Sequence, residues 1–343
     1  MKIKSKVLIY APNIHTGGGI ELLKQLINEF DSQFELNIDV RSKNIDDLES
    51  VKVNYINPNI FSRLFAEWKL KKQSFKYDVI LCFSNLPPLL KLDSRVVLFL
   101  QNKLLISNNS SNDFPFSQKL RLIIKRLWLR LFIKNVNRYV VQTDHMKEAF
   151  YKSLGKNSKV MVCPFYDFVK PNYSIDKTYD FIYIASGDPH KNHKTLINAW
   201  VSLAKENCYP ILALTLDTNK YKSLIEWCDK MRIKYGLKII NLGWIKNKNE
   251  LINLYFQSRA MIYPSKIESF SIPLIEANEY NIPIIASELD YVRDVCNPVE
   301  TFNPNSAKSI SRSVKRFLGV KHELVKVNSS KNFLNEVLSN FKY

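Results

Sequence analysis

The amino-acid sequence predicts an α/β protein made of two tandem units, each a parallel sheet wrapped by helices. Short apolar runs alternate with amphipathic helical patterns along almost the whole chain, an order typical of parallel sheets with helical crossovers. The alternation is interrupted once, near residues 163–172, where Pro164 and Pro171 bracket a stretch without a clear period. The chain of 343 residues is also about twice the usual domain length. We therefore expect one domain over residues 1–165, a second over 173–325, and a C-terminal helix over 326–343 that packs back on the first.

Each unit repeats the order strand, loop, helix. In the first unit, an apolar run precedes three glycines and a helical pattern, and buried strands are expected over residues 7–10, 78–83, 96–100 and 139–143. In the second unit, helices are expected over 194–205 and about 273–280, and strands over 181–185, 211–216, 239–240, 260–263 and 282–286. Two such units leave a cleft between them, and doubly wound sheets bind ligands at the carboxyl ends of their strands.

Composition and charge narrow the class of protein. With 46% hydrophobic and 24% charged residues, the chain is an ordinary globular protein. Lys and Arg outnumber Asp and Glu by 50 to 32, and the net charge of +18 indicates an anionic partner. Nucleic acid, an anionic membrane face and a phosphate-bearing substrate all fit the charge. No helix-turn-helix, RRM-like or finger motif is found, so we expect no nucleic acid, and a basic nucleic-acid-binding protein is kept only as an alternative.

The cysteines and the apolar segments indicate the cellular compartment in which the protein is expected. Five cysteines are scattered without a CxxC spacing, so we expect neither a disulfide framework nor a zinc site, and a reducing cytoplasm fits. Three lysines precede only a short apolar run at Val7–Tyr10, which we interpret as a strand rather than a signal peptide. No run of about 18 apolar residues occurs, so no transmembrane helix is expected.

The most informative segment is PSKIESFSIPLIEA, residues 264–277, which follows an expected strand. Glu268 falls in the loop at the carboxyl end of that strand, Pro273 is placed to start a helix, and Glu276 falls in its first turn. Backbone N–H groups at such a position bind phosphate or sugar oxygens, and a carboxylate beside them accepts hydrogen bonds from hydroxyl groups. Alternatively, both glutamates only favour the helix N-terminus electrostatically.

The pair Glu268 and Glu276 resembles the paired-glutamate signature of the family 4 retaining glycosyltransferases. The resemblance implies the GT-B fold, two facing Rossmann-like domains with a cleft between them. It implies that Glu268 lies near the transferred sugar as a catalytic residue and that Glu276 binds the donor ribose. Donor-binding roles extend to Ser269, Phe270 and Ser271, the last standing where the family usually has glycine.

A second part of the resemblance lies upstream, over residues 185–194. Gly187 and Lys191 match the family pattern of a glycine followed by a lysine before the helix, whereas Asp188 replaces the expected arginine. The resemblance implies that Gly187 binds the donor and that Lys191 is catalytic, neutralising the diphosphate as a point charge. His190 and His193 lack a third ligand nearby, so capping or surface roles are expected rather than a metal site.

Two glycine-containing loops complete the expected donor site. Gly17–Gly19 do not form a GxGxxG motif, so a dinucleotide site is not expected. In the resembled family this loop faces the donor, so Gly18 and Gly19 are expected to contact the donor diphosphate or the acceptor. Gly243 and Trp244 are expected near the nucleotide base.

The chemistry implied by the resemblance needs no cofactor. Many relatives carry a histidine where this chain has Gln101 and Asn102, so no general base is named, and the leaving phosphate is expected to take the acceptor proton. No Asp-x-Asp motif is found, since Glu288 to Asp290 is only a weak approximation, so we expect no divalent metal. Lys191 and the helix start near Pro273 supply the positive charge instead.

A basic helix is expected over residues 118–135, without an acidic residue. Its basic residues include Lys119, Arg126, Arg130 and Lys134, and its apolar stripe is Leu120, Ile124, Leu127, Trp128 and Leu131. It is either a membrane-surface helix attracted to anionic lipid or a core-packed helix with a solvated basic face. In both cases we expect the stripe to be buried.

Together these features predict a retaining glycosyltransferase that moves a sugar from a nucleotide-diphosphate sugar to a saccharide or lipid-linked acceptor. Related enzymes assemble bacterial surface polysaccharides such as the O-antigen of lipopolysaccharide. We expect the protein in the cytoplasm, peripheral at the inner face of the plasma membrane. A GT-B sugar-nucleotide epimerase is the enzymatic alternative. The sequence does not fix the donor sugar, the base or the acceptor.

Overall fold

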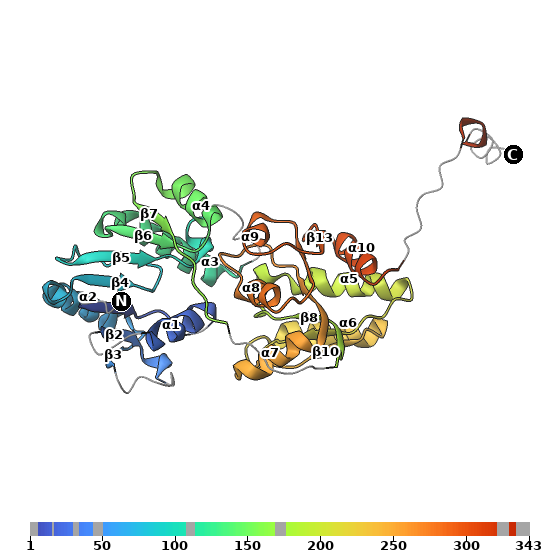
Figure 1. The fold of residues 1–343 in the computed structure, drawn as a ribbon, viewed down its shortest axis with the longest axis horizontal. Helices are drawn as coiled ribbons and strands as arrows, with labels where there is room; N and C mark the ends of the chain where they lie inside the picture. The colour runs from blue at the N-terminus through green and yellow to red at the C-terminus, as the bar shows by residue number, and fades with distance from the viewer. Residues whose placement is uncertain are drawn as a thin grey trace.

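The computed structural model describes residues 6–15, 17–29, 34–43, 51–107, 114–168, 176–320 and 329–333. Within them the chain forms two parallel sheets, one of seven strands and one of six. The two sheets, each with its helices, lie beside each other along the long axis of the molecule (Figure 1). This confirms the prediction of an α/β protein with two doubly wound units.

The N-terminal sheet has the strand order β3-β2-β1-β4-β5-β6-β7, and all its pairings are parallel. Its strands are β1 (Val7–Ala11), β2 (Phe34–Asp39), β3 (Lys52–Ile56), β4 (Val79–Cys82), β5 (Arg95–Phe99), β6 (Arg138–Val141) and β7 (Val160–Val162). Its helices are α1 (Gly18–Asn28), α2 (Ile60–Gln73), α3 (Phe116–Leu131) and α4 (Asp144–Leu154). The buried side chains of α1 join one apolar cluster of the core, and those of α2, α3 and α4 join another. In a right-handed crossover, the direction in which the chain moves along the sheet decides which face the helix covers. The connection through α1 moves one way along the sheet, and those through α2, α3 and α4 move the other way. Helix α1 therefore covers one face of the sheet, and the other three helices cover the opposite face.

The C-terminal sheet has the order β10-β9-β8-β11-β12-β13, again all parallel. Its strands are β8 (Tyr179–Tyr183), β9 (Leu212–Leu214), β10 (Ile239–Asn241), β11 (Ser258–Tyr263), β12 (Ile284–Ser287) and β13 (Glu300–Phe302). The helices are α5 (His193–Lys205), α6 (Lys222–Tyr235), α7 (Lys248–Phe256), α8 (Ile272–Glu279), α9 (Asp290–Arg293) and α10 (Ala307–Phe317). One continuous apolar cluster fills this half, with Trp200, Tyr183 and Tyr263 among its fully buried side chains.

The last strand of the first sheet, β7, ends at Val162, and the first strand of the second sheet, β8, begins at Tyr179. Residues 163–168 have no regular secondary structure, and residues 169–172 lie outside the described part of the chain. The expected C-terminal helix over 326–343 also lies outside it, apart from residues 329–333. No described helix has the length and apolar character needed to cross a lipid bilayer.

Helix α3 does not fit one of its two expected alternatives, a helix whose apolar stripe packs in the core. Four members of its apolar stripe are exposed: Leu120, Ile124, Leu127 and Leu131. The opposite side of the helix, with Leu129, enters the core instead. Arg126 does not belong to a free basic face either, because its guanidinium donates hydrogen bonds to the carbonyls of Leu104 and Ser107. A stripe repeating at helical spacing marks a face of a helix but does not say which face the core covers.

Candidate functional site

The N-termini of two helices, one from each half, meet between the sheets. Helix α1 begins at Gly18 after β1, and α8 begins at Ile272 after β11, so both start beyond the carboxyl ends of parallel strands. A Cβ atom on Gly18 would lie 3.1 Å from the Cδ1 atom of Ile272. The residues before the two helices, Gly17 and Ser271, provide no side-chain cap. Uncapped N–H groups and two helix dipoles therefore place partial positive charge at one point, which favours an anion.

Lys191 and Glu268 form an ion pair at this end of the C-terminal sheet. The Nζ atom of Lys191 lies 2.5 Å from Oε1 of Glu268, and both side chains are largely buried. The same carboxylate oxygen accepts hydrogen bonds from the hydroxyls of Ser265 and Tyr263. The loop before α5 and the loop after β11 are also joined directly, since the amide of Lys266 donates to the carbonyl of His190. The structure thus brings together two predicted site residues that lie 77 positions apart in the sequence.

Glu276 is placed differently from what the sequence suggests. Helix α8 begins at Ile272, one residue before Pro273, so Glu276 lies beyond the first turn and is only 3% exposed. The prediction of a first-turn position is therefore wrong, and the explanation that Glu276 merely favours the helix N-terminus loses its basis. Its two carboxylate oxygens accept hydrogen bonds from two tyrosines. The hydroxyl of Tyr255 bonds Oε2 at 2.7 Å, and that of Tyr166 bonds Oε1.

Tyr166 reaches Glu276 from the segment that leaves the N-terminal domain. The ammonium group of Lys248 lies 4.9 Å from the centre of the Tyr166 ring. The next residue, Asp167, exchanges two hydrogen bonds with the side chain of Gln25 on α1. Tyr166 thus binds a carboxylate of the C-terminal domain, while the next residue, Asp167, is bound by the N-terminal domain.

The pKa values of Glu268 and Glu276 are shifted in opposite directions. Burial raises the pKa of Glu276, against the lowering effect of its two tyrosine hydrogen bonds. Burial would also raise the pKa of Glu268, but the charges of Lys191 and His190, with hydrogen bonds from Lys191 and Ser265, hold it below its usual value. Environments that drive two carboxyl pKa values apart are a feature of functional sites.

The loop that carries Gly187 is shaped by a residue that sequence reasoning missed. A Cβ atom on Gly187 would lie 2.5 Å from the Tyr221 ring, which leaves room for glycine only. The Tyr221 hydroxyl donates to Asp188, and the Ser186 hydroxyl donates to the other oxygen of that carboxylate. Asp188, which stands where the resembled family has arginine, therefore organises the loop.

The conformation of the loop before α8 shows why the resembled family usually has glycine at the position of Ser271. Ser271 adopts a left-handed conformation with φ of 51° and is buried. Glycine adopts such a φ without strain, whereas other residues lose about 1 to 2 kcal/mol there. Phe270 beside it is buried and Ser269 is half-buried. Gly19 approaches the site from the N-terminal side, where a Cβ atom would lie 3.3 Å from Oε1 of Gln101.

Gly243 and Trp244 lie apart from this cluster. They follow β10, the edge strand, and β9 and β8 separate it from β11. Gly243 has a positive φ of 76°, and Trp244 is 64% exposed. Their expected place near a nucleotide base stays a prediction.

Two N-terminal residues that the sequence did not indicate face the C-terminal domain. The Nζ atom of Lys103, just beyond β5, lies 2.5 Å from Nε2 of His145. The Nδ1 atom of His145 lies 3.4 Å from a carboxylate oxygen of Asp290. Burial lowers the pKa of Lys103, while Asp290, Asp294 and Glu268 act to raise it. The sequence carries a signal for Lys103, because it follows directly on Gln101 and Asn102 beyond the end of β5.

The histidines near Lys191 have no metal-binding arrangement. His193 is 3% exposed, its ring lies against that of Tyr183 with centroids 4.8 Å apart, and neither of its ring nitrogens has a hydrogen-bond partner, so neither the capping nor the surface role holds for it. Burial lowers its pKa to about 3. Across the described part of the chain, no three His, Cys, Asp or Glu side chains gather as a metal site.

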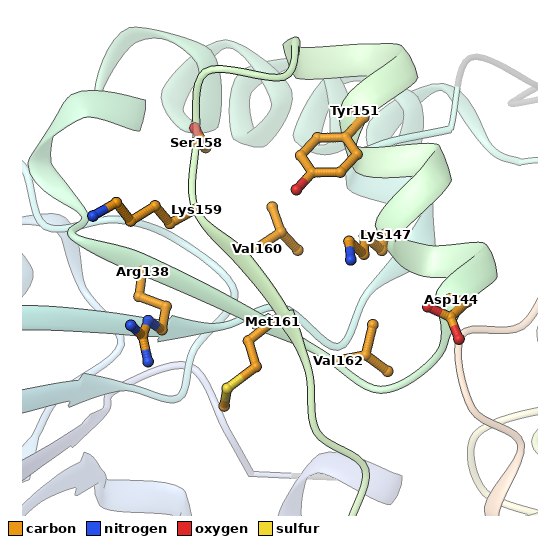
Figure 2. Close-up of a pocket in the computed structure, with 9 residues that line it drawn as sticks. All are labelled: Arg138, Asp144, Lys147, Tyr151, Ser158, Lys159, Val160, Met161 and Val162. Atoms are coloured by element: carbon orange, nitrogen blue, oxygen red, sulfur yellow. The ribbon is translucent and has the colours of Figure 1, made fainter.

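A pocket of about 740 Å³ lies elsewhere, beside β7 and α4 (Figure 2). It contains none of the predicted site residues. Its lining residues are Arg138, Asp144, Lys147, Tyr151, Ser158, Lys159, Val160, Met161 and Val162.

Comparisons of sequence show which known proteins this chain is similar to. The sequence profile of the family described as "Glycosyl transferases group 1" matches residues 167–330. The chain is 28% identical over 144 residues to the serotype-specific mannosyltransferase WbdA of Escherichia coli, covering 41% of this chain and 17% of WbdA. It is 25% identical over 195 residues to the O-antigen chain mannosyltransferase RfbU of Salmonella typhimurium, covering 55% of this chain and 53% of RfbU. The chain thus spans about half of RfbU and a smaller share of WbdA.

Solved structures resemble the whole molecule. Anabaena Alr3699/HepE in complex with UDP-glucose superposes with a TM-score of 0.67 at 14% identity, covering 91% of this chain and 89% of HepE. The lipopolysaccharide outer core galactosyltransferase WaaB, in its apo form, gives 0.61 at 18% identity, covering 98% and 99%. These likenesses show the fold. Residues 167–330 of this chain therefore form a glycosyl transferases group 1 domain, within a molecule that has the GT-B fold.

Proposed function

We propose that the protein is a retaining glycosyltransferase that transfers a sugar from a nucleotide-diphosphate sugar to a saccharide acceptor. One observation carries the proposal: the buried Lys191–Glu268 pair lies in the C-terminal domain at the sheet end where the uncapped N-termini of α1 and α8 meet. An ammonium group and two helix dipoles suit a diphosphate. A carboxylate beside them suits the hydroxyl groups of a sugar.

The roles of the residues follow from this arrangement. Lys191 neutralises the charge that grows on the departing diphosphate, with the amides at Gly18, Gly19 and the start of α8 beside it. Glu268, held as a carboxylate, faces the transferred sugar. Glu276 accepts hydrogen bonds from the ribose hydroxyls, in competition with the hydroxyl of Tyr166. The acceptor proton goes to the leaving phosphate, so no separate general base is needed.

Positive charge from the protein makes a divalent metal unnecessary in this mechanism. Lys191 supplies a full charge, and each helix N-terminus supplies roughly half of one. The proposal therefore includes metal-independent transfer with retention of the anomeric configuration.

The acceptor that we propose is a lipid-linked saccharide of a bacterial surface polysaccharide, reached at the cytoplasmic face of the membrane. Its support is the function of the similar proteins, which are a serotype-specific mannosyltransferase, an O-antigen chain mannosyltransferase and a lipopolysaccharide outer core galactosyltransferase. The net charge of +18 agrees with work beside anionic lipid.

The test begins with a thermal-shift screen of uridine and guanosine diphosphates and their sugars. A ligand at 100 times its dissociation constant adds about 2.7 kcal/mol to stability. Transfer from the donor so identified is then assayed in excess EDTA, and the anomeric proton of the product is followed by NMR. Activity that returns only with Mg²⁺ would refute metal independence, and an inverted product would refute retention. Donor turnover without any acceptor would indicate a sugar-nucleotide epimerase.

A further inference from the structure

Helix α2 is apolar on two opposite sides, but only one of them is covered. Ala66 and Leu70 enter the N-terminal core. On the other side five large apolar side chains share one helical face: Ile60 (75% exposed), Phe61 (85%), Leu64 (52%), Phe65 (61%) and Trp68 (48%). A contiguous exposed patch of large apolar side chains normally marks an interaction site. The described part of the chain leaves this face open.

Helix α3 repeats the arrangement. Its outer face carries Phe116 (82% exposed), Leu120 (48%), Ile123 (51%), Ile124 (53%), Leu127 (52%) and Leu131 (74%). At about 100° per residue, these positions fall within one side of the helix, opposite the buried Leu129.

The two faces belong to one surface. Both helices cover the same face of the N-terminal sheet, since Leu70 and Leu129 join the same apolar cluster. The turn at residues 87–89 ties them together: its Leu89 amide donates to Glu67 of α2, and its Pro87 carbonyl accepts from Trp128 of α3. We call the outward faces of α2 and α3 the docking face.

The charges of the docking face are of one sign. Helix α3 has no acidic residue, and helical geometry places Lys119 and Arg130 on one side of its apolar stripe and Arg121 and Lys125 on the other. The one acidic residue of α2, Glu67, is buried and accepts hydrogen bonds from Tyr10 and Leu89. The ammonium group of Lys72 lies 3.8 Å from the centre of the Trp68 ring.

We propose that the docking face binds an anionic lipid bilayer, with both helices lying flat in the interface. The apolar side chains enter the boundary between headgroups and acyl chains, while the flanking lysines and arginines reach the phosphates. A second copy of the chain fits less well, because it would set one basic face against another. The inference deepens the proposed function by naming the surface that brings the site to a lipid-linked acceptor, but its observations do not depend on that function.

The experiment measures sedimentation with vesicles of phosphatidylcholine and phosphatidylglycerol, and with vesicles of phosphatidylcholine alone. The parent is expected to bind the mixed vesicles and to bind the neutral ones more weakly. The double variant Ile60→Ser/Phe61→Ser should bind the mixed vesicles at least about tenfold more weakly, because two exposed apolar side chains are lost. Ile233→Ser is the matched control, since Ile233 on α6 is 74% exposed but lies in the other domain. It should bind like the parent.

Three results would overturn the proposal. In the first, the parent does not bind the mixed vesicles. In the second, the double variant binds them as well as the parent does. In the third, the parent is a dimer in solution and the double variant is a monomer. Far-ultraviolet circular dichroism checks that the variant is folded. Stabilisation by nucleoside diphosphates is measured on the same samples. If nucleoside diphosphates stabilise the protein but the vesicles do not bind it, the docking-face proposal is wrong and the proposed function stands. If the vesicles bind the protein but nucleoside diphosphates do not stabilise it, the proposed function is wrong and the docking-face proposal stands.

Discussion

At the scale of single residues, the proposed chemistry depends on the Lys191–Glu268 pair. Lys191→Ala removes the charge that we assign to the departing diphosphate and leaves a buried carboxylate without its cation. Turnover is expected to fall at least about 100-fold, with weaker nucleoside diphosphate binding, as for the loss of a group that stabilises transition-state charge. Steady-state assays with the identified donor measure the effect. Lys194→Ala is the control, because Lys194 is exposed on α5 three residues away; equal rates in both variants would make Lys191 an ordinary buried lysine.

The second prediction for a single residue concerns Tyr166. Its hydroxyl occupies the Glu276 oxygen that we assign to the ribose, so it competes with the donor. Tyr166→Phe should tighten nucleoside diphosphate binding by about tenfold or more, because a hydrogen bond to a charged group is worth about 1.5 to 3 kcal/mol. Glu276→Ala should weaken binding more than about tenfold. Calorimetry distinguishes them: if both variants weaken binding, Tyr166 positions Glu276 rather than competing for it.

At the scale of elements, the site depends on how closely the loop after β8 packs against the start of α6. Gly187→Ala would set a methyl group against the Tyr221 ring, and overpacking of this kind costs about 1 to 3 kcal/mol. Urea unfolding should show this loss for Gly187→Ala. In the Tyr221→Ala background, the same substitution should cost much less. An unchanged cost in that background would show that another contact excludes the methyl group.

At the scale of the whole molecule, the buried His193 makes stability depend on pH. Its pKa in the folded chain, about 3, is below that of the unfolded chain. The unfolded state therefore binds more protons below pH 6.5, and stability is lost as the pH falls from there toward 3. Between pH 7 and pH 5 one such group accounts for about 2 kcal/mol. His193→Phe keeps the stacking on Tyr183 and removes the titration.

Urea unfolding of the parent and His193→Phe at the two pH values measures the difference. The variant should lose less stability on acidification, by about that amount. An identical loss in both proteins would show that His193 is protonated in the folded state.

The sequence by itself determined the fold class and predicted the residues of the candidate site. Apolar runs alternating with helical patterns fix a doubly wound architecture, because strand and helix periods are local properties of the chain. The segment with Glu268 and Glu276, and the loop with Gly187 and Lys191, could be placed at strand ends for the same reason. Even the unusual Ser271 stood out in the sequence, and its left-handed φ gives the physical reason why the family prefers glycine.

Only the tertiary structure decided which of these groups meet and which surfaces stay open. The pairing of Lys191 with Glu268 and the bond from Tyr166 to Glu276 join residues 77 and 110 positions apart, and no local period encodes such distances. Lys103 and His145 were missed because their relation to Asp290 arises where the two domains meet. The apolar stripe on α3 does not pack in the core, because Leu129 on the other side of the helix fills the core there. Helical spacing defines a face, and only the packing of the remaining chain determines what that face contacts.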